Sequence, residues 1–190
     1  FDDYLYLRSF ALLVEALHNS RPFEEFFRSA MSLGISRFGM LRRISDSLEN
    51  PPQDVLEILQ GFKDETQGEL WDSGDELVAH YQNDENYERL RNGEVGGNLI
   101  YKYKALSIVF AAEGWISVLG DVCKNIAREK LEDLAEVAQE VERIDLLSNF
   151  CHMKLAGILN VEEDVAPIDM ESSYDIVGWL QSDEGTPLEH

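Results

Sequence analysis

Apolar residues recur along most of the chain at the spacing of an amphipathic helix. In residues 3–18 they fall three or four positions apart and share one helix face, at Tyr6, Phe10, Leu13 and Leu17. The same spacing predicts further helices over residues 22–33, 35–48, 52–63, 74–82, 84–92, 98–126 with a kink near Gly114, 129–156 and 174–182. No segment shows a convincing strand-like alternation, and no repeat of about 20–50 residues occurs. The pattern predicts an all-α protein, an irregular bundle of about seven to nine helices.

Breaking and capping residues divide the chain into parts. Gly34 and Pro51 each end a helix, and Ser73 with Glu76 has the spacing of a capping box. We expect a helical bundle over residues 1–160, a polar linker over 161–172, a C-terminal helix over 173–182 packed on the bundle, and a tail over 183–190. The last residues, 188–190, look like the start of a histidine tag, and the chain begins at Phe1 rather than Met. These ends predict a domain taken from a longer protein.

The helical periodicity also predicts which side chains are buried. We expect three tryptophans to anchor the core: Trp71, Trp115 and Trp179. The inner face of the longest helix carries Leu134, Val137, Val141 and Ile144. Its outer face is acidic and is expected to be solvated, with Glu132, Asp133, Glu136, Glu140 and Glu142 exposed.

The charge balance narrows the classes of partner. The chain has 16 basic and 37 acidic residues, a net charge of −21, which repels phosphate backbones and anionic lipid surfaces. We therefore expect no nucleic-acid partner and no membrane partner, and no apolar run is long enough for a span. The densest basic patch, Arg37, Arg42 and Arg43, either pairs with surplus acids or docks a partner domain.

The two cysteines, Cys123 and Cys151, lie in apolar, helix-like surroundings and form no CxxC or CxxxCxxC motif. This argues against a cysteine-ligated zinc or iron–sulfur site within the chain. We expect two buried free thiols in a reducing compartment, which indicates a cytoplasmic location. The sequence leaves the oligomeric state open.

A glycine-rich turn opens directly into the helix that begins near residue 98, and it is the clearest candidate for a functional surface. One interpretation is a helix N-terminus that offers N–H groups to an anion. The alternative is close backbone packing, with an Asn98 cap and half-buried tyrosines. The pattern matches neither a P-loop nor a dinucleotide fingerprint. The candidates for a ligand site or a domain interface are Glu94, Gly96, Gly97, Asn98, Tyr101 and Lys102. Lys104, two residues after Lys102, is expected on another side of the helix.

One spacing suggests a metal site. Glu15 and His18 have the E-x-x-H spacing found in carboxylate-bridged di-iron bundles. Such a site needs a second motif and two further inward carboxylates, and the sequence contains only one E-x-x-H. Chance spacing, or a histidine at a helix C-terminus, therefore remains the simpler interpretation.

Three patches together resemble a known family. They are residues 10–27, with Phe10-Ala11-Leu12-Leu13-Val14-Glu15 and Pro22-Phe23-Glu24-Glu25-Phe26-Phe27, residues 93–104, and Ser173-Tyr174-Asp175-Ile176-Val177-Gly178-Trp179-Leu180. The chain, from about residue 3 to 181, resembles the uncharacterised helical domain that follows the cobalamin-binding and radical SAM domains in a group of bacterial iron–sulfur oxidoreductases. In that family the CxxxCxxC cluster motif, the S-adenosylmethionine site and the cobalamin-binding region lie upstream.

The resemblance implies an accessory domain whose partners are the upstream domains of the same polypeptide. It implies a 4Fe-4S cluster, S-adenosylmethionine and cobalamin for the parent protein only, and it transfers no catalytic residue to this chain. We therefore expect a non-catalytic module that packs on a radical SAM core or helps to recruit substrate. One alternative is a small-ligand-binding helical bundle with a concave site beside Asn98 and Lys102. Another is a di-metal carboxylate protein built around Glu15 and His18.

Overall fold

The computed structural model describes residues 1–159 and 172–189, and this part consists of helices and their connecting segments, with no strand. It contains ten α-helices, nine of seven or more residues, and one π-helical segment. In chain order these are α1 (Asp2–Leu13), η1 (Val14–Asn19), α2 (Glu24–Ser32), α3 (Arg37–Ser47), α4 (Gln53–Gly68), α5 (Gly74–Tyr81), α6 (Asp84–Arg91), α7 (Leu99–Phe110), α8 (Ala112–Lys130), α9 (Leu134–Leu159) and α10 (Ile176–Gln181). The predicted all-α multi-helix bundle is confirmed.

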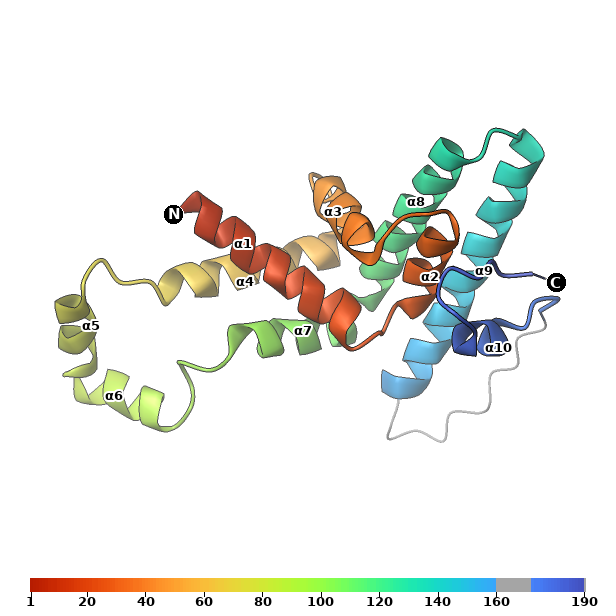
Figure 1. Ribbon diagram of the computed structural model, residues 1–190. Coiled ribbons are helices and arrows are strands. Elements are labelled where there is room, and N and C mark those ends of the chain that lie inside the picture. Colours follow the sequence, from red (N-terminus) through yellow and green to blue (C-terminus); the bar gives the residue numbers. More distant parts are fainter. Residues whose placement is uncertain (160–171, 190) are drawn as a thin grey trace.

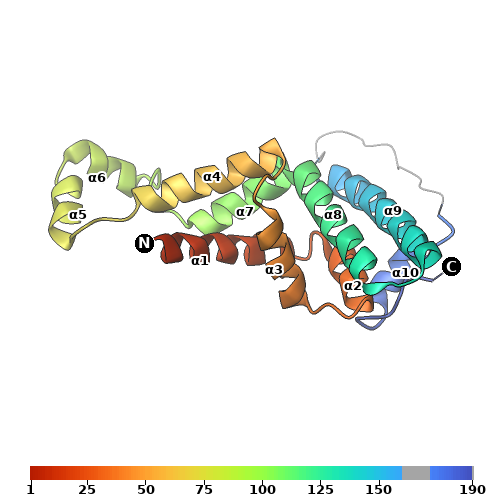
Figure 2. The ribbon, with the colours of Figure 1, turned by 90° about the horizontal axis from the view of Figure 1, so that it is seen from above.

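The helices form an elongated molecule with a bundle at one end and a helical hairpin at the other (Figures 1 and 2). The bundle contains α2, α3, α8 and α9, with α10 packed on it. An arm made of α4 and α7, which run side by side, extends from the bundle, and α1 lies along it. The arm ends in the short helices α5 and α6. The glycine-rich turn at residues 93–98 leads from this hairpin back into α7.

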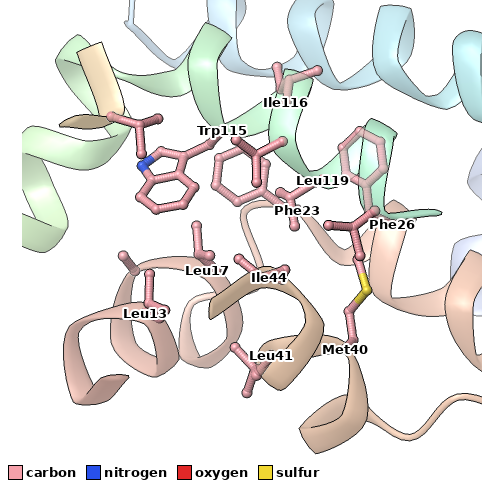
Figure 3. Packing of buried hydrophobic residues seen from close by; sticks show 14 of the residues in the cluster. Leu13, Leu17, Phe23, Phe26, Met40, Leu41, Ile44, Trp115, Ile116 and Leu119 are labelled. Carbon is pink, nitrogen blue, oxygen red and sulfur yellow. The ribbon is translucent and has the colours of Figure 1, made fainter. Parts of the chain in front are cut away.

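The core lies where the bundle meets the base of the arm. Trp115 of α8 is fully buried beside Phe23 and Leu17, while side chains of α3 approach from the opposite side (Figure 3). Burial of such large side chains supplies most of the driving force for folding. Helix α8 is the central element, because its buried face contacts α2, α3 and α9.

The junction between arm and bundle is a sharp bend of 87° between α7 and α8. The break falls at Ala111, three residues before the predicted kink at Gly114. A carboxylate from another helix fixes it: Asp54, at the start of α4, accepts a hydrogen bond from the Gly114 N–H at 3.0 Å. Gly114 is required because a Cβ there would lie 2.7 Å from the Asp54 carboxyl carbon. The glycine therefore permits a close approach between two helix N-termini.

Three expectations about the longest helix are wrong. It begins at Leu134 rather than 129, because Asp133 caps it by accepting hydrogen bonds from the Ala135 and Glu136 N–H groups. Leu134, expected on the inner face, is 85% exposed, since it lies beyond the end of the bundle contact. Glu140, expected in solvent, is buried and interacts with Ser29 and Arg143, at 3.2 Å and 3.1 Å. A partly buried ion pair thus replaces the expected solvated acid.

Two of the three tryptophans are buried as predicted, and one is not. Trp115 and Trp179 are buried, as expected, but Trp71 is 36% exposed in the connection between α4 and α5. The prediction for Trp71 is wrong because no helix of the bundle covers the tip of the arm. Tyr6, which the periodicity places on one helix face with Phe10, Leu13 and Leu17, is likewise exposed.

The C-terminal segment packs on the bundle, as the pattern predicts. Trp179 and Ile176 of α10 form a small apolar cluster with Leu147 of α9 and with Leu188. Leu188 was assigned to the tail, yet it is buried. The N-terminal cap of α10 is Asp175, whose Oδ1 accepts a hydrogen bond from the Gly178 N–H at 2.9 Å. The predicted linker falls largely outside the described residues.

A buried arginine connects α2 to this segment. The Arg28 guanidinium donates hydrogen bonds of 2.8–2.9 Å to the main-chain carbonyls of Leu180, Ser182 and Asp183 and to the Ser182 hydroxyl. It also lies 5.3 Å from the Trp179 ring centroid.

The basic patch mostly pairs with acids. Arg37 bonds to Glu24 and, at 2.6 Å, to Glu184, and Arg43 bonds to Glu129 at 2.7 Å. For Arg37 and Arg43, the geometry therefore favours pairing with surplus acids over docking of a partner domain.

Replacement of Gly114 by alanine tests the arm–bundle junction. Helix propensity alone predicts that Gly114→Ala stabilises the protein by roughly 1 kcal/mol. The overlap with Asp54 predicts the opposite, a loss of about 1–3 kcal/mol, measured by urea unfolding. Gly68→Ala is the matched control, because Gly68 is also helical but has open space around it and should gain stability. A Gly114→Ala protein as stable as wild type would contradict the close approach.

Candidate functional site

A cavity lies at the tip of the arm, between the α5–α6 hairpin and the adjoining ends of α4 and α7. Its volume is about 700 Å³, within the range of small-molecule sites. The wall combines the glycine-rich turn with residues from all four helices. A second, smaller cavity of about 360 Å³ lies between α1, α3 and α4 and is mainly apolar.

Local sequence explains the course of the chain around the larger cavity. Helix α6 ends at Arg91, and the turn that follows contains Gly93 and Gly96; both have positive φ, +74° and +75°, which side chains disfavour. Asn98 then caps α7, because its Oδ1 accepts hydrogen bonds from the Ile100 and Tyr101 N–H groups at 3.1 Å and 3.4 Å. The turn therefore has a structural role and also supplies one wall of the cavity.

A polar contact between α4 and α7 lies at the cavity wall. Lys102 Nζ donates to both carboxylate oxygens of Glu65, at 2.6 Å and 2.7 Å, and the Tyr103 hydroxyl donates to Oε1 of Glu65 at 2.8 Å. The bond from Lys102, supported by that from Tyr103, lowers the pKa of Glu65. Burial and the neighbouring Glu65 carboxylate raise the pKa of Tyr103, so this phenol stays protonated as a donor.

Lys102 and Lys104 point to different sides of α7, as the spacing predicts. Lys104 reaches Glu15 of η1 at 3.3 Å, on the side of the arm away from Glu65. Only Lys102 lines the cavity. The two lysines therefore fix α7 to two different helices.

The opposite wall is aromatic. The Trp71 and His80 rings lie 4.6 Å apart between centroids, and His80 meets Tyr81 edge-on at 4.9 Å. All three rings line the cavity. Rings of this kind offer both apolar surface and a negative π face.

Five of the six sequence candidates lie in the cavity wall: Glu94, Gly96, Gly97, Asn98 and Lys102. The sixth, Tyr101, is 62% exposed and does not line the cavity. Sequence analysis missed the aromatic wall and Glu65. The apolar spacing around Trp71 and His80 was the available signal, but it does not reveal that α5 folds back toward the start of α7.

The structure gives Glu15 and His18 other partners than a metal. They lie in η1, where hydrogen bonds span five residues, so residues three apart do not complete a turn and diverge. Glu15 accepts a hydrogen bond from Asn19 and pairs with Lys104, while the His18 ring packs edge-on against Phe27 at 5.6 Å. Within residues 1–159 and 172–189, no three His, Cys, Asp or Glu side chains form a group that could hold a metal ion.

The cysteines are buried and free, as predicted. Burial raises the pKa of Cys123 far above its usual value, and burial together with Glu25 raises that of Cys151 to about 12. Both thiols therefore remain protonated near neutral pH and are poor nucleophiles. Neither lines a cavity.

Comparisons of the chain with protein-family models, with curated proteins and with solved structures found no match. In the described part of the chain, no single helix is both long and apolar enough to cross a membrane. The apolar pair α7 and α8 reaches that length only jointly and with its bend, and most of the inner face of α8 lies in the core.

The Glu65 contact predicts a pH-dependent contribution to stability. Because the pKa of Glu65 is lowered in the folded state, the contribution is present above the unfolded value of about 4.3 and is lost as the pH falls through the lowered folded value. Urea unfolding should show wild type more stable than Glu65→Gln at neutral pH, by less than about 1 kcal/mol because the pair is half-exposed. This difference in unfolding free energy between wild type and Glu65→Gln should disappear below about pH 4. Glu49→Gln, an exposed acid outside the contact, is the control, and a gap that persists in acid would contradict the assignment.

Proposed function

We propose that this chain is a helical accessory domain that binds a small molecule or a substrate group in the cavity at the tip of the arm and leaves the chemistry to a catalytic partner. The single observation that supports this proposal best is the cavity of about 700 Å³ beside Asn98 and Lys102. Its size suits a small ligand, and its wall mixes apolar rings with a few polar groups.

The chemistry of the wall favours binding over catalysis. Lys102, the one lysine among the described wall residues, donates to both carboxylate oxygens of Glu65, so its amine is engaged and is unsuited to act as a nucleophile. The two thiols are buried elsewhere and protonated. The wall groups therefore orient and hold a ligand.

The parent protein is proposed to be a radical SAM oxidoreductase of the cobalamin-binding type, on the resemblance of residues 10–27, 93–104 and 173–180. In this proposal the cluster, S-adenosylmethionine and cobalamin belong to the upstream domains, which are the partners of this chain. Phe1 and, on helix α1, Tyr4 and Leu7 are exposed, and this surface is the proposed contact with the upstream domains. Two buried free thiols fit a reducing compartment, so the proposed location is the cytoplasm.

A cavity-filling substitution tests the binding function. Gly97 lines the cavity without a positive φ, and nothing lies within 4 Å of a Cβ built there, so Gly97→Phe fills the space without backbone strain. In a thermal-shift screen of small molecules, compounds that raise the Tm of wild type should not raise that of Gly97→Phe. Gly74→Phe is the matched control, because Gly74 has the same open surroundings but does not line the cavity. Equal shifts in all three proteins, or no shift with any compound, would show the proposal to be wrong.

The coding sequence upstream of Phe1 tests the proposed parent enzyme. A CxxxCxxC motif is expected there, because three cysteine thiolates at this spacing hold the cluster in the family that the chain resembles. An upstream region without this motif would contradict the radical SAM assignment and leave the binding function to be judged by the Gly97→Phe experiment.

A further inference from the structure

The charges of the cavity wall favour one class of ligand, and this inference rests on the proposed binding function. Three carboxylates line the cavity, at Glu65, Glu69 and Glu94, against two cations, at Arg89 and Lys102. Both cations are already paired: Lys102 with Glu65, and Arg89 with Glu94 at 3.5 Å. Among the described residues, the Glu69 side chain has no ion pair or hydrogen bond. The excess charge of the wall is therefore negative.

The groups that would attract an anion already have hydrogen-bond or ion-pair partners within the protein. The N-terminus of α7 faces the cavity, but Asn98 Oδ1 accepts from two of its free N–H groups. An anion would have to displace this cap and compete with Glu65 for Lys102. It would also enter against the field of a protein with net charge −21. The anion interpretation of the glycine-rich turn is therefore disfavoured.

The aromatic wall complements a cation. Trp71 and Tyr81 line the cavity, and a cation within about 6 Å of a tryptophan or tyrosine ring is attracted by the quadrupole of the ring. Trp71 is the only one of the three tryptophans that is not buried, so its ring is accessible to a ligand. Rings and unpaired carboxylate together form the arrangement that recognises organic ammonium ions.

The hairpin supplies an apolar surface for the body of such a ligand. Helices α5 and α6 contain no buried residue, and Leu77 lines the cavity while 38% exposed. Leu99, at the start of α7, is buried at the opposite side of the cavity. Apolar side chains that no core covers remain in contact with water. A ligand that covers them therefore binds with a favourable contribution to its binding free energy.

We propose that the cavity at the tip of the arm binds an organic cation, a primary or quaternary ammonium group on an apolar or aromatic body, through the rings of Trp71 and Tyr81 and the carboxylate of Glu69.

Three probes of matched shape and different charge test this proposal: 2-phenylethylammonium, 2-phenylethanol and 3-phenylpropanoate. Titrations of the ¹⁵N-labelled protein are followed through the three indole N–H signals, with Trp71 assigned from Trp71→Phe and the buried Trp115 and Trp179 as internal references. The ammonium should shift the Trp71 signal with an affinity about tenfold higher than the alcohol. The propanoate should bind most weakly, and Gly97→Phe should abolish binding.

Charge variants distinguish the effect of a carboxylate in the cavity from the effect of the protein's overall negative charge. The variant Glu69→Gln should weaken ammonium binding about tenfold and leave alcohol binding unchanged. The matched control replaces one exposed acid outside the cavity, Glu49→Gln, and changes the net charge equally, from −21 to −20, because each variant removes one acidic group. The control should bind the ammonium as wild type does.

The outcomes distinguish this inference from the function on which it rests. Binding of the alcohol or the propanoate as tightly as the ammonium, still abolished by Gly97→Phe, would overturn the cation proposal and leave the cavity a binding site. Equal weakening in both charge variants would also overturn it, since general attraction would then explain the preference. No shift of Trp71 with any probe, or shifts unaffected by Gly97→Phe, would overturn both proposals.

Discussion

The hydrogen bond from the Gly114 N–H to Asp54 determines how the rest of the molecule is arranged. It holds the N-terminus of α8 against that of α4 and so sets the sharp bend after α7. One consequence is that α8 enters the bundle, where its apolar face forms the centre of the core. The other is that α7 runs back along α4 and forms the arm. The cavity therefore owes its position to a contact at the opposite end of α4.

Stability decreases along the arm from the bundle to the tip. The bundle is organised around fully buried side chains such as Trp115 and Phe26, and the arm still buries Phe62 and Tyr103 between its two helices. The hairpin has no buried residue and is connected to the arm mainly through the turn at residues 93–98 and through Trp71. Regions with few buried apolar contacts open at low free-energy cost. The hairpin side of the cavity is therefore expected to open at the lowest free-energy cost. A ligand that contacts this side would stabilise the hairpin directly.

Sequence periodicity predicted nearly every helix, because most of them pack one apolar stripe against a neighbour and begin or end at a glycine, proline or capping residue that can be recognised. It failed where tertiary contacts decide the outcome. Trp71 looks like a core residue until the arm is seen to extend beyond the bundle, and Glu140 looks like a surface acid until α2 brings Ser29 next to it. The π-helical turn at Val14–Asn19 separates Glu15 from His18, which an α-helical spacing places together. For the site, the sequence identified the turn but not the wall facing it, since that wall depends on the fold-back of α5.

The way Arg28 binds the C-terminal segment has a consequence for how the sequence can vary. Three of its four acceptors are main-chain carbonyls, and only one is a side chain, Ser182. Carbonyl groups are common to all residues, so substitutions at Leu180 and Asp183 keep the acceptors as long as the chain follows the same path. Related proteins can therefore diverge in this segment while the arginine stays, and a buried arginine in α2 would be a better marker of this fold than the sequence it contacts.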